Sequence, residues 1–227
     1  MKIYTKIGDQ GKTTFFGCGL VPKDDPRIEA FGALDELNSV IGVTLCFVDD
    51  EQLCKTLTKI QHDLFQVGAD LGGTKLEVAM PRVTAGHIEE LESAIDGLEE
   101  KLKMPKAFIL PGGTQASAFL HLCRAITRRA ERTLVSVQQV LIINPELIRY
   151  LNRLSDFLYV LARQANKEVE VQEQQPIYKY FTEEINEGTN SEKEIHEKEN
   201  KAKEGLNIFL GDKTIEVNAH GKRVVED

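Results

Sequence analysis

Arginine side chains are concentrated in one predicted helix, and they are the groups of this sequence best suited to binding an anion. Arg124, Arg128 and Glu131 are spaced i, i+4 and i+7, so they share one helix face. Guanidinium groups beside apolar surface need anionic partners, and phosphate matches the planar fork of arginine. Ion pairs between helices would explain the same pattern, so both interpretations stay open here. The apolar neighbours of this face are Ala118, Leu122, Ala125, Ile126, Ala130 and Leu134.

A second set of phosphate-binding residue types lies near the N-terminus, in the segment Gly-Asp-Gln-Gly-Lys-Thr-Thr of residues 8–14. This segment is not a P-loop, because Lys6 stands where that motif requires a glycine, and Phe-Phe-Gly-Cys-Gly rather than a helix follows it. Its two glycines still allow backbone N–H groups to converge, and Lys12 and Thr13 add donors suited to a polyphosphate. A mobile N-terminal turn is the alternative.

A third polar set lies in the last predicted helix, where Asn152 and Asp156 are four residues apart between leucines. Polar residues at this spacing share a helix face, so they either line a pocket or face solvent.

Apolar periodicity and capping residues predict five helices joined by short connections. Residues 1–26 are expected to be irregular. The expected helices run from Pro26 to Leu45, from Asp50 to Leu71, from Thr84 to Leu102, from Thr114 to about Ser136, and from Pro145 to about Asn166. No alternation of strands and helices is visible, so the fold class is all-α, a five-helix bundle, rather than a Rossmann or P-loop fold.

The character of the chain changes after about Gln172. Residues 183–204 contain eight acidic residues and four lysines, which is typical of a flexible or weakly helical linker. Residues 206–217 then predict two short strands around a Gly-Asp turn. We therefore expect a domain at residues 1–172 and a charged C-terminal extension at 173–227 that ends in a short hairpin. This extension is either a solvated appendage or a segment that docks on the bundle or on a neighbour.

Composition excludes several classes of function. A net charge of −8 over 227 residues argues against general nucleic-acid binding. No apolar run reaches the roughly 18–20 residues of a membrane span, and the N-terminus has no signal-peptide apolar region. The four cysteines form no C-x-x-C pair, so we expect reduced thiols and a cytoplasmic protein. The five histidines are scattered, and we interpret them as structural or solvated.

Six segments in a fixed order together resemble a known family, the propanediol-utilisation (PduO) type of ATP:cob(I)alamin adenosyltransferases. The resemblance covers residues 1–168, and the extension lies outside it. Lys12 stands where members of the family vary, and Ile7 replaces a frequent Thr. The matching segments are residues 4–14, 23–32, 35–39, 108–113, 124–132 and 150–156.

The resemblance implies a homotrimer of five-helix bundles with active sites between adjacent subunits. It implies transfer of the 5′-deoxyadenosyl group of ATP to the cobalt of cob(I)alamin, with release of triphosphate. Mg²⁺ would be bound mainly by the phosphates, with protein ligands unknown. An adenosylcobalamin-dependent client enzyme and a reductant for Co(II) are the expected partners; nucleic acid and membrane are not.

Residue roles follow from the same resemblance, position by position. Arg128 would act on the triphosphate, Asp35 would pair with Arg124 across the interface, and Phe108 would lie over the corrin and exclude the lower axial ligand. These four are the expected catalytic residues, and Phe108 is also the expected cobalamin-binding residue. The expected ATP-binding residues are Thr5, Lys6, Ile7, Gly8, Thr13, Thr14, Lys23, Arg128, Arg129, Glu131, Arg132 and Asn152.

The residue chemistry is compatible with this reaction. Reduced cobalt is itself a strong nucleophile, so no Ser-His-Asp or Cys-His arrangement is needed, and none is evident. The protein must orient C5′ of ATP and stabilise a departing triphosphate, which is positioning and electrostatics. Two alternatives remain open: a phosphotransferase on the same bundle, which would release ADP, and a corrinoid carrier or sensor, which would leave ATP intact.

Overall fold

The computed structural model describes residues 2–4, 6–15, 19–73, 81–103, 105, 107–177, 208–210, 213–217 and 223–224. The chain divides into two compact units, residues 1–176 and residues 177–227, and each is described by itself. Among the described residues, no helix combines the length and the apolarity needed to cross a membrane.

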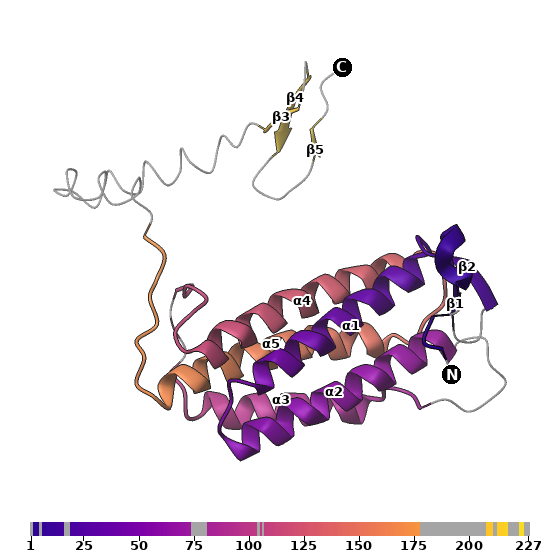
Figure 1. The fold of residues 1–227 in the computed structure, drawn as a ribbon. Coiled ribbons are helices and arrows are strands. Elements are labelled where there is room, and N and C mark those ends of the chain that lie inside the picture. The colour runs from indigo at the N-terminus through magenta and orange to yellow at the C-terminus, as the bar shows by residue number, and fades with distance from the viewer. Residues whose placement is uncertain are drawn as a thin grey trace. The chain divides into compact units, whose positions relative to one another are not determined.

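Among the residues that the structure describes, five α-helices make up most of the first unit, as the sequence predicts (Figure 1). Three of their starts are fixed by capping side chains. Asp25 accepts a hydrogen bond from the backbone N–H of Arg27, Asp50 from that of Leu53, and Thr114 from that of Ser117. The helices are α1 (Pro26–Leu45), α2 (Glu51–Gly72), α3 (Ala85–Glu99), α4 (Gln115–Gln138) and α5 (Glu146–Lys167).

The helices pack as an all-α bundle in which α4 contacts both α1 and α5. Helix α5 also packs against α3, and α1 against α2. Apolar side chains at helical spacing fill the interior and are removed from water, which is the main stabilising contribution to such a bundle. Fully buried side chains include Leu37, Ile41, Leu57, Leu120, Leu134, Tyr150 and Leu154.

A buried carboxylate joins the far end of α2 to the starts of α3 and α5. Asp70 is 2% exposed and accepts hydrogen bonds from the backbone N–H of Val83 at 2.9 Å and from Asn144 Nδ2 at 2.7 Å. Arg82 Nε lies 3.3 Å from the other carboxylate oxygen. A buried charge is tolerated only when it is paired and hydrogen-bonded in this way.

The two ends of the bundle present different segments. The N-terminal segment lies at one end, and the loop of residues 107–114 between α3 and α4 lies at the other (Figure 1). Helix α4 has 24 residues, and it therefore spans about 36 Å at ~1.5 Å per residue. Within one chain, residues near Gly8 are consequently far from Phe108.

Three local features differ from the sequence-based expectation. The N-terminal region is not wholly irregular, because β1 (Lys12–Phe15) pairs antiparallel with β2 (Gly19–Pro22) after a short 3-10 helix η1 (Ile7–Gln10). Helix α3 ends at Glu99, although Leu102 beyond it is buried. Phe31 and Leu122 follow the apolar periodicity but are 43% and 45% exposed.

The second unit contains short strands. β3 (Ile208–Leu210) pairs antiparallel with β4 (Lys213–Val217), with Phe209 opposite Thr214, and this is the expected hairpin. A further strand, β5 (Arg223–Val224), pairs with β4 and was not predicted. The charged segment 183–204 lies outside the described residues.

Candidate functional site

The N-terminal segment brings Lys6, Ile7, Gly8 and Lys23 together. η1 begins after Lys6, whose φ is 62°, and ends at Gly11, whose φ is 71°. The backbone N–H of Lys23 donates to the carbonyl of Gly11 at 2.8 Å, which closes the segment into a compact loop. A Cβ added at Gly8 would lie 3.0 Å from Nζ of Lys23, so glycine leaves room for the lysine side chain to cross here.

Thr13 and Thr14 lie on β1, opposite Val21 and Leu20 of β2. Successive strand residues point to opposite faces, so the two hydroxyls lie on opposite faces of this ribbon. Thr13 is partly buried and Thr14 is exposed. Thr5, the other threonine expected to bind ATP, lies outside the described residues.

The arginines of α4 do not share one environment. Arg129 forms an ion pair with Glu36 of α1, whereas Arg132 donates from Nη1 to the backbone carbonyl of Arg128 at 3.2 Å. Arg128 is exposed, and no ion pair among the described residues includes it. One of the two sequence-based interpretations, ion pairing between helices, therefore applies to Arg129, while Arg128 and Arg132 face outward.

Glu131 and Asn152 meet between α4 and α5. Asn152 Nδ2 donates to Glu131 Oε1 at 2.9 Å, although the two residues are 21 positions apart in the sequence. This hydrogen bond fixes the glutamate beside the outward-facing arginines one turn away. The remaining lone pairs of the carboxylate and the amide oxygen are hard donors of the kind that Mg²⁺ prefers. Among the described residues, no cluster of three or more His, Cys, Asp or Glu could bind a metal ion.

Phe108 lies on the loop between α3 and α4 and is 83% exposed. Beside it is a cavity of about 490 Å³ whose wall includes Arg124 of α4. The structure thus brings together two residues, Phe108 and Arg124, that the sequence placed 16 positions apart. An exposed aromatic ring at the mouth of a cavity provides apolar surface for a large planar ligand.

Two buried polar residues of α5 fix this loop, and the sequence analysis did not single them out. Asn166, 2% exposed, accepts from the backbone N–H of Thr114 at 3.0 Å and donates to the carbonyl of Gly112 at 3.0 Å. A Cβ added at Gly113 would lie 2.6 Å from Cγ of Asn166, and the φ of Gly113 is +105°. Glycine is therefore required there for both space and backbone conformation.

Arg163, one helical turn before Asn166, fixes the chain that leads from α3 into this loop. It donates to the carbonyl of Lys103 at 2.9 Å and to both carboxylate oxygens of Glu173 at 3.0 and 3.1 Å. The backbone N–H of Leu110 donates to the carbonyl of Gln174 at 2.7 Å. The segment after α5 thus braces the loop that presents Phe108, although the six matching sequence segments all end before it.

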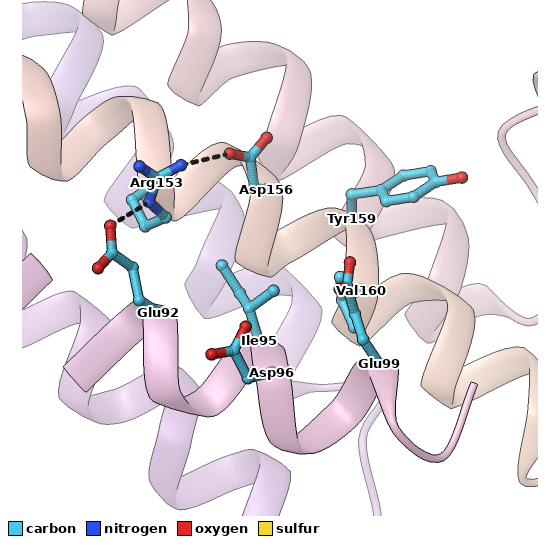
Figure 2. Close-up of a pocket in the computed structure, with 8 residues that line it drawn as sticks. All are labelled: Glu92, Ile95, Asp96, Glu99, Arg153, Asp156, Tyr159 and Val160. Atoms are coloured by element: carbon cyan, nitrogen blue, oxygen red, sulfur yellow. Dashed lines mark hydrogen bonds and ion pairs between the residues drawn. The ribbon is translucent and has the colours of Figure 1, made fainter. Parts of the chain in front are cut away.

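A second hollow, between α3 and α5, is unsuited to a phosphate ligand. Its volume is about 540 Å³, and Figure 2 shows side chains from both helices around it. Arg153 bridges Glu92 at 2.9 Å and Asp156 at 3.2 Å, so its charge is already compensated. Asp96 and Glu99 add two further carboxylates. Acidic groups therefore outnumber the one guanidinium, and a triphosphate would be repelled.

Asp35 is exposed on α1, and no described ion pair joins it to Arg124 within the chain. Phe31 and Val43, four residues before and eight after Asp35, are both more than two-fifths exposed, although the ring of Phe31 also lies beside Gly68 of α2. Val135 is similarly exposed on α4. Asp35 thus belongs to an exposed side of α1 that contains large apolar side chains.

A family model described as cobalamin adenosyltransferase matches residues 3–165, which include the whole bundle as far as the last turn of α5. The chain belongs to this family. It is thereby an enzyme of the transferase class, and the fold class and family expected from the sequence are confirmed.

Individual relatives agree with the family match. The corrinoid adenosyltransferase of Bacillus subtilis (strain 168) is 42% identical over 170 residues, which cover 73% of this chain and 87% of that protein. The corrinoid adenosyltransferase PduO of Citrobacter freundii is 40% identical over 165 residues, 72% of this chain. That match covers 49% of the Citrobacter protein, so the chain matches about half of it.

Solved structures with bound ligands are also similar. A phenylalanine-to-alanine variant of the PduO-type ATP:corrinoid adenosyltransferase of Lactobacillus reuteri, complexed with cobalamin and ATP, has a TM-score of 0.74 and 36% identity, over 78% of this chain and all of that one. An arginine-to-lysine variant of the same enzyme, complexed with ATP, has a TM-score of 0.72 and 37% identity, over 77% of this chain and all of the other.

Proposed function

We propose that this enzyme transfers the 5′-deoxyadenosyl group of ATP to cob(I)alamin and releases triphosphate, at sites formed between the subunits of a homotrimer. The observation that supports this most directly is the separation of the candidate groups. The N-terminal segment, which contains Lys6, Gly8 and Lys23, lies at one end of the bundle, the loop of residues 107–114 lies at the other, and the outward-facing arginines lie on α4.

The N-terminal segment is the proposed nucleotide-binding part. Its lysines supply positive charge, and Gly8 permits Lys23 to lie across η1. Thr5, Ile7, Thr13 and Thr14 remain assigned to ATP by position in the family. Since the two threonines of β1 point to opposite faces, we expect partly buried Thr13 and exposed Thr14 to contribute differently, one to the ligand and one to the ribbon.

Arg128 and Arg132 are proposed to stabilise the departing triphosphate. A preorganised guanidinium that faces a developing negative charge stabilises the transition state more than the bound ground state. Arg129, which is paired with Glu36, contributes less charge to a ligand and more to the α1–α4 packing. Asn152 positions Glu131 at the same place.

Mg²⁺ is proposed to accompany the triphosphate. The carboxylate of Glu131 and the amide oxygen of Asn152 are chemically suitable for it, and phosphate oxygens and water would supply the other ligands. When bound, Mg²⁺ would neutralise part of the phosphate charge. The residues of this chain orient the nucleotide and exclude water around the reacting atoms.

Phe108 is proposed to contact the corrin. Its ring is exposed on a loop fixed at both ends, so it can cover the lower face of a planar macrocycle without being displaced. Exclusion of an axial base leaves four-coordinate cobalt, which is easier to reduce to the nucleophilic Co(I) state. Reduction requires an external electron donor. We expect both this donor and a client enzyme that uses adenosylcobalamin to be present with the enzyme in the cytoplasm.

An interface between copies would bring the separated groups together. The side of α1 that contains Phe31, Asp35 and Val43 is exposed, and its apolar side chains provide surface that a neighbouring subunit would cover. Asp35 of one subunit would pair with Arg124 of its neighbour. A desolvated pair of this kind orients the two subunits and is costly to break.

Co-expression of two inactive variants tests the shared site. One variant replaces Lys23 and Gly8 in the nucleotide segment, and the other replaces Arg128. If each site takes its segment from one subunit and its arginine from the next, random mixed trimers should recover about a quarter of the wild-type activity. No recovery in mixed trimers, with both variants confirmed in the same assembly, would place all these groups in one subunit.

Analysis of the phosphate products tests the reaction. Wild-type enzyme with ATP and reduced cobalamin should form triphosphate in proportion to the alkylated corrinoid. Formation of ADP would indicate the phosphotransferase alternative, and unchanged ATP with bound corrinoid would indicate a carrier or sensor.

A further inference from the structure

The cavity beside Phe108 is lined by polar residues, one of which, His121, has no role assigned so far. Its wall includes Phe108, Ile109 and Pro111 of the loop, His121 and Arg124 of α4, and Tyr159 of α5. His121 and Arg124 are three residues apart, so they lie on the same face of α4. The loop side of the cavity is apolar, whereas the α4 side is polar.

His121 is buried without a hydrogen-bond partner. Its exposed fraction is 3%, and neither ring nitrogen is hydrogen-bonded to any residue in the described part of the chain. The ring of Tyr159 packs against it edge-on, with centroids 6.0 Å apart. Buried polar atoms normally have partners, because an unsatisfied group loses its hydration without compensation.

A second unsatisfied group lies in the same cavity. Nε of Arg124 is buried and has no hydrogen-bond partner among the described residues. Its terminal nitrogens remain available for the proposed pair with Asp35 of a neighbouring subunit. Two residues of the cavity wall therefore carry buried, unsatisfied groups: Arg124 has an N–H that can only donate, and His121 has an imidazole that can both donate and accept.

The charge state of the imidazole restricts what can bind. Burial, with a smaller contribution from the charge of Arg124, lowers the pKa of His121 to about 4. The ring is therefore neutral near pH 7, with one bare nitrogen. A cation is disfavoured by the guanidinium of Arg124, and a carboxylate or phosphate has no hydrogen to donate to the bare nitrogen.

A primary carboxamide satisfies both groups. Its carbonyl oxygen can accept from Nε of Arg124, and its NH₂ group can donate to the bare nitrogen of His121. The rim of the corrin ring bears acetamide and propionamide side chains. We propose that His121 and Arg124 form a subsite for one peripheral carboxamide of the corrin, and that His121 selects the amide over the corresponding acid. This proposal rests on the assignment of Phe108 to the corrin side.

Two substitutions test the role of His121. His121→Phe retains an aromatic ring but removes both nitrogens, and His121→Gln retains a donor and an acceptor. The Phe variant should raise the KM for cob(I)alamin roughly tenfold, as expected for loss of one buried hydrogen bond, with the KM for ATP unchanged. The Gln variant should remain within about threefold of wild type. Equal losses in both variants, or no loss in His121→Phe, would overturn the subsite.

Thermal unfolding of the ligand-free protein distinguishes binding from a structural role. His121→Phe replaces two unsatisfied nitrogens by apolar atoms, so its Tm should equal or exceed that of wild type. A lower Tm together with unchanged corrinoid binding would mean that His121 serves packing alone, and would contradict the proposal.

The ligand chemistry can be tested directly with cobalamins in which one peripheral amide has been hydrolysed to a carboxylic acid. One member of such a set should bind wild-type enzyme at least tenfold more weakly than cobalamin, and His121→Phe should lose most of this discrimination. Equal discrimination by both proteins would overturn the amide assignment. So would a histidine-ligated cobalt spectrum that disappears in His121→Phe.

Phe108→Ala serves as the control for the underlying assignment. Suppose that wild type binds cobalamin and that Phe108→Ala raises the KM for cob(I)alamin, while His121→Phe leaves this KM unchanged. In that case the subsite is wrong and the assignment of Phe108 stands. If wild type binds no corrinoid, the proposed function itself is wrong.

Discussion

At the scale of single residues, the four arginines of α4 differ in the groups that surround them. Arg129 is neutralised by Glu36, and Arg124 lines the cavity beside Phe108. Arg128 is exposed and has no ion pair within the described part of the chain. An uncompensated guanidinium retains its full charge for an anionic ligand, so Arg128 is the arginine whose loss should matter most.

Arg128→Ala should lower kcat/KM by ~10²–10³-fold, or about 3–4 kcal/mol of transition-state stabilisation, with the oligomeric state unchanged. Arg149→Ala is a matched control, because Arg149 is also exposed on a helix but is already paired with Glu146; it should change kcat/KM by less than about twofold. Steady-state kinetics and sedimentation of both variants provide the comparison. Near-normal turnover of Arg128→Ala would exclude its role.

The low pKa of His121 predicts a specific loss of stability in acid. The unfolded chain binds the histidine proton near pH 6.5, whereas the folded chain binds it near pH 4. Below pH 6.5 the unfolded state therefore binds more protons, and stability falls as pH falls from 6.5 to 4. His121→Phe should lack this contribution to the pH dependence of stability. Urea unfolding at pH 7 and pH 4 should show a stability difference between variant and wild type that grows at pH 4; a constant difference would be evidence against the buried neutral ring.

The spacing of the arginines revealed the polar face of α4 because helical periodicity is local. It could not reveal the burial of His121, since the same spacing is compatible with a solvated side chain. Likewise, Glu131 and Asn152 were each expected at the nucleotide site, but their mutual hydrogen bond depends on how α4 packs against α5.

At the scale of elements, the helix starts were predictable because capping is also local. Asp25, Asp50 and Thr114 each bond to a backbone N–H two or three residues ahead. The N-terminal hairpin was missed because its strands have four residues each, too few for a clear alternation. The fixation of the Phe108 loop was missed because Asn166 is 54 residues from Gly112 in the sequence.

Gly113→Ala should disrupt this fixation. The added Cβ would overlap the Asn166 side chain, and φ of +105° is unfavourable for alanine, so we expect a loss of about 2–4 kcal/mol of stability. The corrinoid KM should rise as well, because the loop moves. Gly97→Ala on α3 is the control: no atom lies within 4 Å of its added Cβ, and alanine should stabilise that helix by about 0.5–1 kcal/mol. Equal stability of the two variants would argue against the proposed fixation.

At the scale of the whole molecule, the residues that contact the bundle continue beyond the end of the family match. The family match ends at residue 165, yet Glu173 and Gln174 contact Arg163 and the Phe108 loop. The sequence suggested an extension from residue 173, because charge and composition change there. Composition does not show which residues of a polar segment bond back to the bundle.

Two truncations separate these parts. Deletion of residues 183–227 should leave kcat within about threefold, since the charged segment contains few apolar residues. Deletion of residues 172–227 removes Glu173, the ion-pair partner of buried Arg163, and should cost about 3–5 kcal/mol of stability. It should also raise the KM for cob(I)alamin strongly. Unfolding curves and cobalamin kinetics on both proteins test this. Equal behaviour of the two truncations would contradict a bracing role for residues 172–176.

The central claim is adenosyl transfer from ATP to reduced cobalamin, and one anaerobic measurement tests it most directly. Wild-type protein is mixed with chemically reduced cobalamin, ATP and Mg²⁺, and the absorbance spectrum is followed. The spectrum of cob(I)alamin should convert to that of adenosylcobalamin, with one triphosphate released for each corrinoid alkylated. A cob(I)alamin spectrum that persists with folded, ATP-bound enzyme would contradict the account.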